Sequence, residues 1–507
     1  MESLVSLCAR RLVGHRGSTQ RALALLPAEL YPALFRAAFL DGQALVLRDL
    51  VLDWPFPVLN FQRLLGHPDP HHKKNRGYNG RLGVQAIVSA LLGAAISLGF
   101  PLPPSASRCH LRLLDMTGLQ DIDAKHGPEG LSLWSGTVAL ARASLDVAKH
   151  QNDLSKRVSK RRKGPLGVSV APPPFAVEIR ADLFVNSTSF GVLRDALGAA
   201  TTGFLHIRCR DFHAEELSTD SIVVLLELLE PTGVRRVDLR FNNLGLAGLG
   251  VVLPHLTRFP NLLSLKLPYS NVDVRRATPG TDAGLRRLAA HLADLPGLKE
   301  LNLGSSRLSG NLRQLLCDLK TPLESLELAF CSLLAADFAF LCQSPHAPAL
   351  RKLDLSGHDF TENLLQPLQR LLEEVSASLL HLDLLECRLT DDQLEVLLPA
   401  LCRCSRLRCL GLFGNLFSTA ALKVLVEKTM ILPDLRLVIY PYPLDCYSRG
   451  PPRPPSGAGW IFEDAVDRER FTAANAELGR MLQSFGRADV VWTTSLSQHS
   501  ALDYFTL

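Results

Sequence analysis

The stretch "LRKLDLSGHDF", from Leu350 to Phe360, has leucines at its first, fourth and sixth positions. Because side chains of a strand alternate between its two faces, the leucines at the fourth and sixth positions, Leu353 and Leu355, point to the same side. The residue between them, Asp354, points to the opposite side. The ninth position, His358, is polar and comes where the chain turns after the strand. The stretch therefore predicts a short strand with one buried face.

The same pattern recurs through the second half of the chain. Successive copies start 28, 36, 25, 27, 29, 28 and 28 residues apart. The starts are Val234, Leu262, Leu298, Leu323, Leu350, Leu379, Leu407 and, for a weaker eighth copy, Leu435. This period, with room for a helix between motifs, is typical of leucine-rich repeats, whose units bury their apolar faces only against their neighbours. The sequence therefore predicts an α/β leucine-rich-repeat solenoid, a horseshoe with parallel strands on the concave face and helices on the convex face.

The ninth position of each motif is expected to bond the backbone of the turn. Its occupants are Asn242, Ser270, Ser306, Cys331, His358, Cys387 and Asn415. Cys331 and Cys387 are therefore predicted to be buried and unreactive. The nearby Cys402, Cys404 and Cys409 lack the paired C-x2-C spacing of a closed zinc site, so no metal is predicted.

Four regions are predicted along the chain. Residues 1–105 form an N-terminal helical region, and residues 106–230 form atypical capping repeats with the degenerate motifs "LRLLDMTGL" and "FLHIRCRDF". Residues 231–445 hold the regular repeats. Residues 446–507 form a C-terminal cap, because they contain a helical apolar stripe followed by the apolar strand "VVWTT". The stripe consists of Phe471, Ala474, Leu478, Met481, Leu482 and Phe485.

Two unusual segments interrupt this pattern. The basic run 155–167, "SKRVSKRRKGPLG", is predicted to be an exposed linker, with a nuclear-import signal as the alternative. It has no interleaved aromatic residues on which bases could stack, so nucleic acid is not predicted as a partner. The uncharged segment Val84–Phe100 is predicted to be a buried helix and not a membrane span, because it is at the short limit for crossing a bilayer.

Composition favours a protein-binding function. Of the 507 residues, 47% are hydrophobic, and 55 basic residues nearly balance 50 acidic ones. This balance argues against a dedicated nucleic-acid binder. Eleven cysteines without framework spacing, and no signal peptide, predict a reduced cytoplasmic protein, with the nucleus as an alternative.

The sequence carries no motif of catalysis. It contains no P-loop, dinucleotide fingerprint, G-x-S-x-G elbow or H-E-x-x-H run. We therefore predict no catalytic residue, no cofactor and no enzymatic activity.

The fifth position of each motif is predicted to face the open concave side of the solenoid. The predicted client face consists of Asp238, Lys266, Asn302, Glu327, Asp354 and Asp383. The three consecutive acids Glu327, Asp354 and Asp383 would form a negative stripe that contacts a partner. The alternative is that they are ordinary solubilising residues.

The N-terminal residues contain two short motifs. Ser3, Leu4, Cys8 and Leu12 would form one face of a helix capped by Ser3. This spacing resembles the elongin-binding BC box, in which the leucine fills a pocket on elongin C. The alternative is an amphipathic helix that packs on the first repeat.

The second motif is "LPAELYPAL". Its residues Leu26, Pro27, Leu30 and Leu34 resemble a cullin 2 box. Pro32 lacks the N–H that would bond the carbonyl of Ala28 and crowds that carbonyl, so the motif is predicted to form two short turns.

The order of motifs also resembles a known family. "LPAELYPALFRAAF", "DWPFPVL", "RRVDLRFNNLGL" and "PLESLELAFCSLL" are similar to the melanoma-antigen (PRAME) family of leucine-rich-repeat proteins. This resemblance implies a substrate receptor of a cullin 2 ubiquitin ligase, recruited through elongins B and C. Resemblance to one member of this family implies negative regulation of Toll-like-receptor signalling to NF-κB, by binding the beta subunit of the inhibitor-of-κB kinase and disrupting the kinase core complex. The alternative is a stoichiometric inhibitor without a ligase role.

Overall fold

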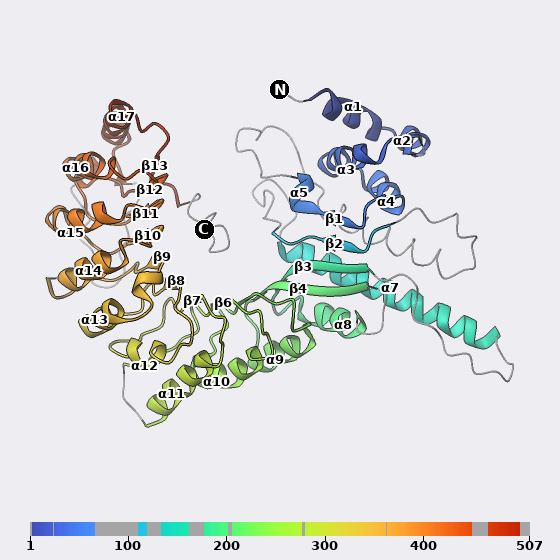
Figure 1. The fold of residues 1–507 in the computed structure, drawn as a ribbon, viewed down its shortest axis with the longest axis horizontal. Coiled ribbons are helices and arrows are strands. Elements are labelled where there is room, and N and C mark those ends of the chain that lie inside the picture. The colour runs from blue at the N-terminus through green and yellow to red at the C-terminus, as the bar shows by residue number, and fades with distance from the viewer. Residues whose placement is uncertain are drawn as a thin grey trace. The chain divides into compact units, whose positions relative to one another are not determined.

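In the computed structural model (Figure 1), the chain folds into two compact units, residues 1–237 and 238–507. The structure describes residues 3–23, 25–65, 110–118, 133–161, 177–200, 205–275, 279–360, 362–448 and 465–496. The predicted helix Val84–Phe100 lies outside these residues.

Unit 1 begins with a helical subdomain. Its elements are α1 (Leu4–Val13), α2 (Arg16–Leu23), the 3-10 turn η1 (Ala28–Leu30), α3 (Tyr31–Leu40), α4 (Ala44–Leu52) and α5 (Phe61–Leu65). Phe35 and Phe39 of α3 point inward and meet the ring of Phe61 edge-on at centroid distances of 5.6 and 5.4 Å. Trp54 packs edge-on against Phe35 as well, at 5.6 Å. These buried rings hold the subdomain together, because edge-to-face pairs add to the free energy of apolar burial.

A parallel sheet follows within unit 1. Its strands β1 (Val58–Asn60), β2 (Leu113–Asp115), β3 (Val177–Val185) and β4 (Leu205–Ala214) pair in chain order. Helices α7 (Leu133–Arg161), α8 (Phe190–Ala200) and α9 (Thr219–Leu228) accompany them. Strand–helix alternation therefore starts well before the first regular motif at Val234.

Helix α7 corrects one prediction from sequence. Residues 155–161, the first half of the basic run, were predicted to be linker, but they continue α7 without a break. Lysine and arginine are good helix formers, and the run contains no glycine or proline before Gly164. Residues 162–167 lie outside the described residues.

Unit 2 contains the regular repeats. Strand β5 (Arg236–Asp238) spans the boundary between the units; the strands of unit 2 are β6 (Ser264–Lys266), β7 (Glu300–Asn302), β8 (Ser325–Glu327), β9 (Lys352–Asp354), β10 (His381–Asp383), β11 (Cys409–Gly411), β12 (Leu437–Ile439) and β13 (Val491–Thr493). From β6 to β13 they pair in parallel and in chain order. The helices between them are α10 (Gly245–Leu256), α11 (Pro279–Ala293), α12 (Leu312–Leu316), α13 (Ala335–Gln343), α14 (Glu362–Val375), α15 (Asp391–Arg403) and α16 (Thr419–Thr429). This is the predicted leucine-rich-repeat solenoid.

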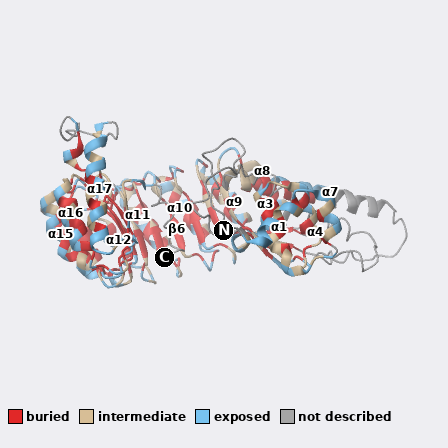
Figure 2. Ribbon diagram, turned by 90° about the horizontal axis from the view of Figure 1, so that it is seen from above, coloured by how far each residue is buried: buried red, intermediate tan, exposed pale blue. Residues whose placement is uncertain are grey.

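The repeat leucines form the core of unit 2. At the fourth position Leu265, Leu301, Leu326, Leu353, Leu382 and Leu410 are fully buried, and the strands that carry them are red in Figure 2. Burying a leucine side chain contributes about 2 kcal/mol. Since each strand pairs only with the preceding and following strands, each repeat is stabilised mainly by its neighbours.

Five ninth-position side chains bond backbone carbonyls of the turns, as predicted, whereas the hydroxyl of Ser270 has no partner; the five are Asn242, Cys331, His358, Cys387 and Asn415. Asn415 is fully buried; its amide donates to the carbonyls of Leu384 and Leu412 at 2.8 Å each, and its oxygen accepts from the N–H groups of Cys387 and Leu389. The thiol of Cys331 donates to the carbonyl of Leu303 at 3.2 Å. Burial raises the pKa of Cys331 to about 12, which keeps the thiol protonated and unreactive.

The C-terminal residues form helix α17 (Arg468–Ser484), capped by Asp467, and strand β13. Ala474, Leu478 and Leu482 of the predicted stripe are buried, and Phe485 ends the helix at 46% exposure. Tyr440 on the preceding repeat donates to Asn475 at 2.8 Å. Helix α17 therefore covers the last repeat of unit 2. Within the ranges described, no helix is both long and apolar enough to cross a bilayer.

The turn asparagine leads to a first prediction. Asn415→Ala removes four hydrogen bonds from buried backbone groups and should destabilise unit 2 by about 3 kcal/mol, measured by urea unfolding. Ser270 occupies the same position of another repeat, is fully buried and has no hydrogen-bond partner for its hydroxyl. Ser270→Ala is the matched control and should change the unfolding free energy by less than about 0.5 kcal/mol. Equal effects of the two substitutions would contradict this account of the turn.

Candidate functional site

Helix α1 presents its motif residues to solvent. Ser3 caps the helix, since its hydroxyl accepts from the N–H of Ser6 at 3.2 Å. Ala9 and Val13, one turn apart, are buried and attach the helix to the subdomain. Leu4 is 76% exposed, Cys8 is exposed and Leu12 is half-buried. The helix thus has an inner face that packs and an outer face that carries Leu4 and Cys8.

The second motif, residues 26–34, contains the 3-10 turn η1 and the first turn of α3; the predicted break before Pro32 is present, but the second part belongs to a ten-residue helix and not to a short turn. Pro27 precedes the 3-10 turn η1, and Pro32 lies in the first turn of α3, where a missing N–H leaves no hydrogen bond unmade. Pro27 is exposed, and Leu26 and Leu30 are half-buried.

Leu34 corrects part of this motif. It was predicted to contact cullin 2, but it is only 3% exposed and packs inside unit 1. It lies on the inner side of α3, together with the buried residues Tyr31, Phe35 and Ala38. Leu34 therefore supports the motif from beneath and is not available to a partner.

The fifth-position residues of the repeats lie in one row. Strand register aligns Lys266 with Asn302, Asn302 with Glu327, Glu327 with Asp354, and Asp354 with Asp383. A second row is formed by the third-position residues, because the third and fifth positions share a face of the strand. It comprises Ser264, Glu300, Ser325, Lys352, His381 and Cys409.

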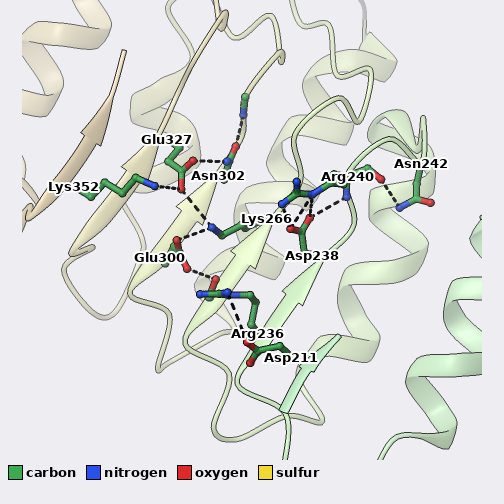
Figure 3. Close-up of polar contacts among 12 residues, drawn as sticks. Asp211, Arg236, Asp238, Arg240, Asn242, Lys266, Glu300, Asn302, Glu327 and Lys352 are labelled. Atoms are coloured by element: carbon green, nitrogen blue, oxygen red, sulfur yellow. Dashed lines mark hydrogen bonds and ion pairs between the residues drawn. The ribbon is translucent and has the colours of Figure 1, made fainter. Parts of the chain in front are cut away.

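Charges of opposite sign interleave across these two rows, which we call the charge ladder (Figure 3). The Lys266 ammonium lies between two carboxylates, 3.0 Å from Glu300 and 3.6 Å from Glu327. Lys352 pairs with Glu327 at 3.2 Å, and Asn302 donates to Glu327 at 2.8 Å. Glu327 therefore receives donors from three strands.

The burial of the charge ladder differs from the prediction. The row was expected to face open solvent, but Asp238 and Asp383 are fully buried and Lys266 is only 9% exposed. Strands of one sheet lie about 4.8 Å apart, so long side chains of adjacent rows cover one another and form ion pairs. Asp238 accepts from the guanidinium of Arg240, and His381 lies 3.0 Å from Asp383.

The three predicted acids thus share their face of the sheet with Lys266 and Lys352, so this face is not uniformly acidic. Sequence reasoning missed Glu300, Lys352 and His381, because it considered only the position between the two leucines. The signal was present: the residue before the fourth-position leucine has the same two-residue periodicity.

Ionisation within the charge ladder follows from these contacts. Burial disfavours the charge on Glu327, but Lys266 and Lys352 outweigh burial and lower its pKa. Asp354 has no such cation. Burial and the neighbouring charges of Asp383 and Glu327 raise the pKa of Asp354 to about 7, although the N–H of Ser356 donates to it at 2.9 Å. Asp354 is thus the acid of the predicted stripe whose pKa is raised to near neutrality.

No group of three or more histidine, cysteine or acidic side chains within the described ranges could hold a metal ion. Cys402 and Cys404 lie at the end of α15, whereas Cys409 lies on strand β11. Burial raises the pKa of Cys404 to about 12, so this thiol stays protonated at neutral pH.

The raised pKa of Asp354 leads to a second prediction. When an acid has a higher pKa in the folded than in the unfolded chain, the free energy of unfolding falls as pH rises between the two pKa values, here from about 4 to about 7. Asp354→Asn should therefore stabilise the protein more at pH 8 than at pH 5, by about 2 kcal/mol. Urea unfolding at both pH values measures this difference.

Asp359→Asn is the control for this prediction, because Asp359 has a side chain that is 58% exposed. It should change stability equally at the two pH values. A pH-independent effect of Asp354→Asn would show that Asp354 is already ionised at pH 5.

Comparison with known proteins agrees with this architecture. The PRAME N-terminal domain model matches residues 2–74 and the PRAME C-terminal domain model matches residues 199–506. Leucine-rich repeat-containing protein 14 of Xenopus laevis is 51% identical, and that of Homo sapiens is 42% identical, each over the full length of both chains. The crystal structure of the leucine-rich repeat-containing protein LegL7 from Legionella pneumophila covers 62% of this chain and 93% of its own, with a TM-score of 0.37 and 18% identity.

The two family models together match most of the chain, and the first corresponds to the helices that carry both N-terminal motifs. The second corresponds to the repeats and the C-terminal helix. The chain therefore belongs to the PRAME family of leucine-rich-repeat proteins.

Proposed function

We propose that the chain is a non-enzymatic adaptor that joins a client protein to a ubiquitin ligase built on cullin 2 and elongins B and C. The observation that carries this proposal is the outward face of α1. Leu4 is 76% exposed at the start of a capped, anchored helix. A single exposed leucine gains about 2 kcal/mol when a partner pocket buries it, and Cys8 one turn later is small enough for close approach of a second backbone.

The exposed part of the second motif fits a contact with cullin 2. Pro27 is exposed, and Leu26 and Leu30 remain half-buried beside it. Proline fixes the backbone before η1, so this surface is already ordered before a partner binds. In this proposal Leu26, Pro27 and Leu30 contact cullin 2, while the buried Leu34 holds α3 in place.

The repeats of unit 2 would hold the client. Solenoids bind proteins over extended strand surfaces, and the charge ladder offers Asn302, Glu327 and Asp354, the members of its fifth-position row that remain partly exposed. We propose that one client is the beta subunit of the inhibitor-of-κB kinase, and that binding it disrupts the kinase core complex and restrains Toll-like-receptor signalling to NF-κB. The ten described cysteines are free thiols, which fits a cytoplasmic site of action.

The proposal predicts the effect of Leu4→Ala with Cys8→Ala on elongin binding. The affinity of the full chain for purified elongin B–C should fall at least tenfold, because hot-spot side chains in interfaces contribute about 2 kcal/mol or more. Calorimetry measures this affinity. Leu45→Ala is the matched control: Leu45 is 55% exposed on α4 of the same unit but lies outside both motifs, and its variant should bind elongins normally.

The same double variant separates the ligase receptor from the stoichiometric inhibitor. A receptor variant should still bind the kinase subunit but should no longer bring it to cullin 2. If the variant keeps full affinity for elongin B–C, the outward face of α1 is not the elongin contact. If it loses elongins but inhibits the kinase as well as the unaltered chain, at constant kinase level, the inhibitor function is correct.

A further inference from the structure

Three aromatic residues occupy a strained position of the repeats. The eighth position has a left-handed backbone in the seven motifs from Val234 to Leu407, whichever residue it carries. Phe241, Tyr269 and Phe330 have φ values of 57°, 58° and 57°, and Ser305 and Gly357 at the same position have 61° and 72°. For residues other than glycine this region costs roughly 1–2 kcal/mol, and bulky side chains are rare there. The turn needs no aromatic ring, since serine and glycine form it in other repeats.

These rings are only partly buried. Phe241 and Tyr269 are each 50% exposed and Phe330 is 38% exposed. We call the three the aromatic rim. Strained residues with exposed apolar side chains disfavour folding twice, through the backbone and through hydration of the ring. An outlier of this kind points to a binding role.

The rim is divided into two platforms. Phe241 and Tyr269 stack with their centroids 4.5 Å apart and their planes 17° from parallel. Phe330 instead lies over the next repeat: a Cβ added at Gly357 would be 2.1 Å from its ring, so only glycine leaves room for it. Tyr269 and Phe330 thus lean apart on either side of Ser305, from strands about 10 Å apart. Two rings so spaced can each hold an apolar side chain from one face of an extended segment.

Three guanidinium groups belong to the two repeats of the first platform and to the next repeat. Arg240 directly precedes Phe241 and its side chain is 40% exposed, while its partner Asp238 is fully buried. Arg275 and Arg307 are about half exposed and share one carboxylate, Asp273, at 2.7 and 3.3 Å. These three cations pair with two carboxylates, the buried Asp238 and the partly exposed Asp273, so the group keeps one excess positive charge.

We propose that the aromatic rim is a docking surface for an extended acidic protein segment, whose apolar side chains pack on the two platforms and whose carboxylates pair with Arg240, Arg275 and Arg307. A nucleic-acid strand fits less well, because a phosphate backbone needs a continuous basic track. Next to Phe330 the eighth-to-tenth positions of the following repeats carry Asp359 and Glu386 beside the single cation Arg388, so basic side chains do not continue as a track. The rim lies in unit 2, so this proposal is independent of the elongin and cullin contacts in unit 1.

A peptide-binding experiment on the full chain tests the proposal. A fluorescein-labelled peptide that alternates glutamate with phenylalanine should bind, measured by anisotropy. Peptides with lysine in place of glutamate, or serine in place of phenylalanine, should bind at least about tenfold more weakly, and so should labelled oligouridine. Binding of the glutamate peptide should weaken with added salt, because the Debye length shortens.

Variants of the rim locate the binding site. Phe241→Ser with Tyr269→Ser, and Phe330→Ser separately, should each reduce affinity about tenfold or more. Serine is the residue that the same turn already carries at Ser305, so the unfolding midpoint should not fall. Arg307→Gln changes only an exposed side chain. It should reduce affinity for the glutamate peptide at low salt, and should leave the weaker binding that remains at high salt unchanged.

Val396→Ser is the matched control, because Val396 is 41% exposed on α15 and lies away from the rim; it should bind as the unaltered chain does. The proposal is overturned if no acidic peptide binds, if the lysine peptide or oligouridine binds as tightly, or if the rim variants retain affinity. It is also overturned if the rim variants lower the unfolding midpoint while Val396→Ser does not, since the rings would then be structural.

Discussion

The structure of unit 2 depends on one constraint: a repeat can bury its fourth- and sixth-position leucines only against the neighbouring repeats. Leu326, Leu353 and Leu382 are fully buried although each strand is three residues long. Such short strands could not be stable alone. The parallel stacking that buries the leucines also aligns every other position into rows. The ninth-position turn residues, the two rows of the charge ladder and the aromatic rim all arise from this alignment.

Alignment in rows explains why charged residues are buried on a face that repeats leave open. Like charges on adjacent strands repel, and Glu327 avoids this only because Lys266 and Lys352 lie on either side of it. Asp354 has no lysine on its far side, where the register places Asp383. The incomplete compensation of charge at Asp354 therefore follows from the order of residues along the row.

The fold was predictable from the repeat because leucine spacing depends only on local geometry. The capped helix at Ser3, the break in helix before Pro32 and the bonding of Asn415 followed from equally local rules of capping and hydrogen bonding. Properties set by packing were not predictable. The burial of Leu34 depends on which side of α3 meets the aromatic core, and the burial of Asp383 depends on side chains from neighbouring strands. The helical start of the basic run was missed because charge alone does not distinguish a linker from a helix.

In this account α1 is the contact that links the repeats to a larger assembly, since its inner residues Ala9 and Val13 fix it and its outer residues Leu4 and Cys8 are left for a partner. Hydrogen–deuterium exchange of the full chain, with and without purified elongin B–C, tests this claim most directly. The account predicts slower exchange across α1, Leu4–Val13, with the repeats of unit 2 unchanged. Unchanged exchange in α1 at saturating elongin B–C, or protection confined to the repeats, would contradict it.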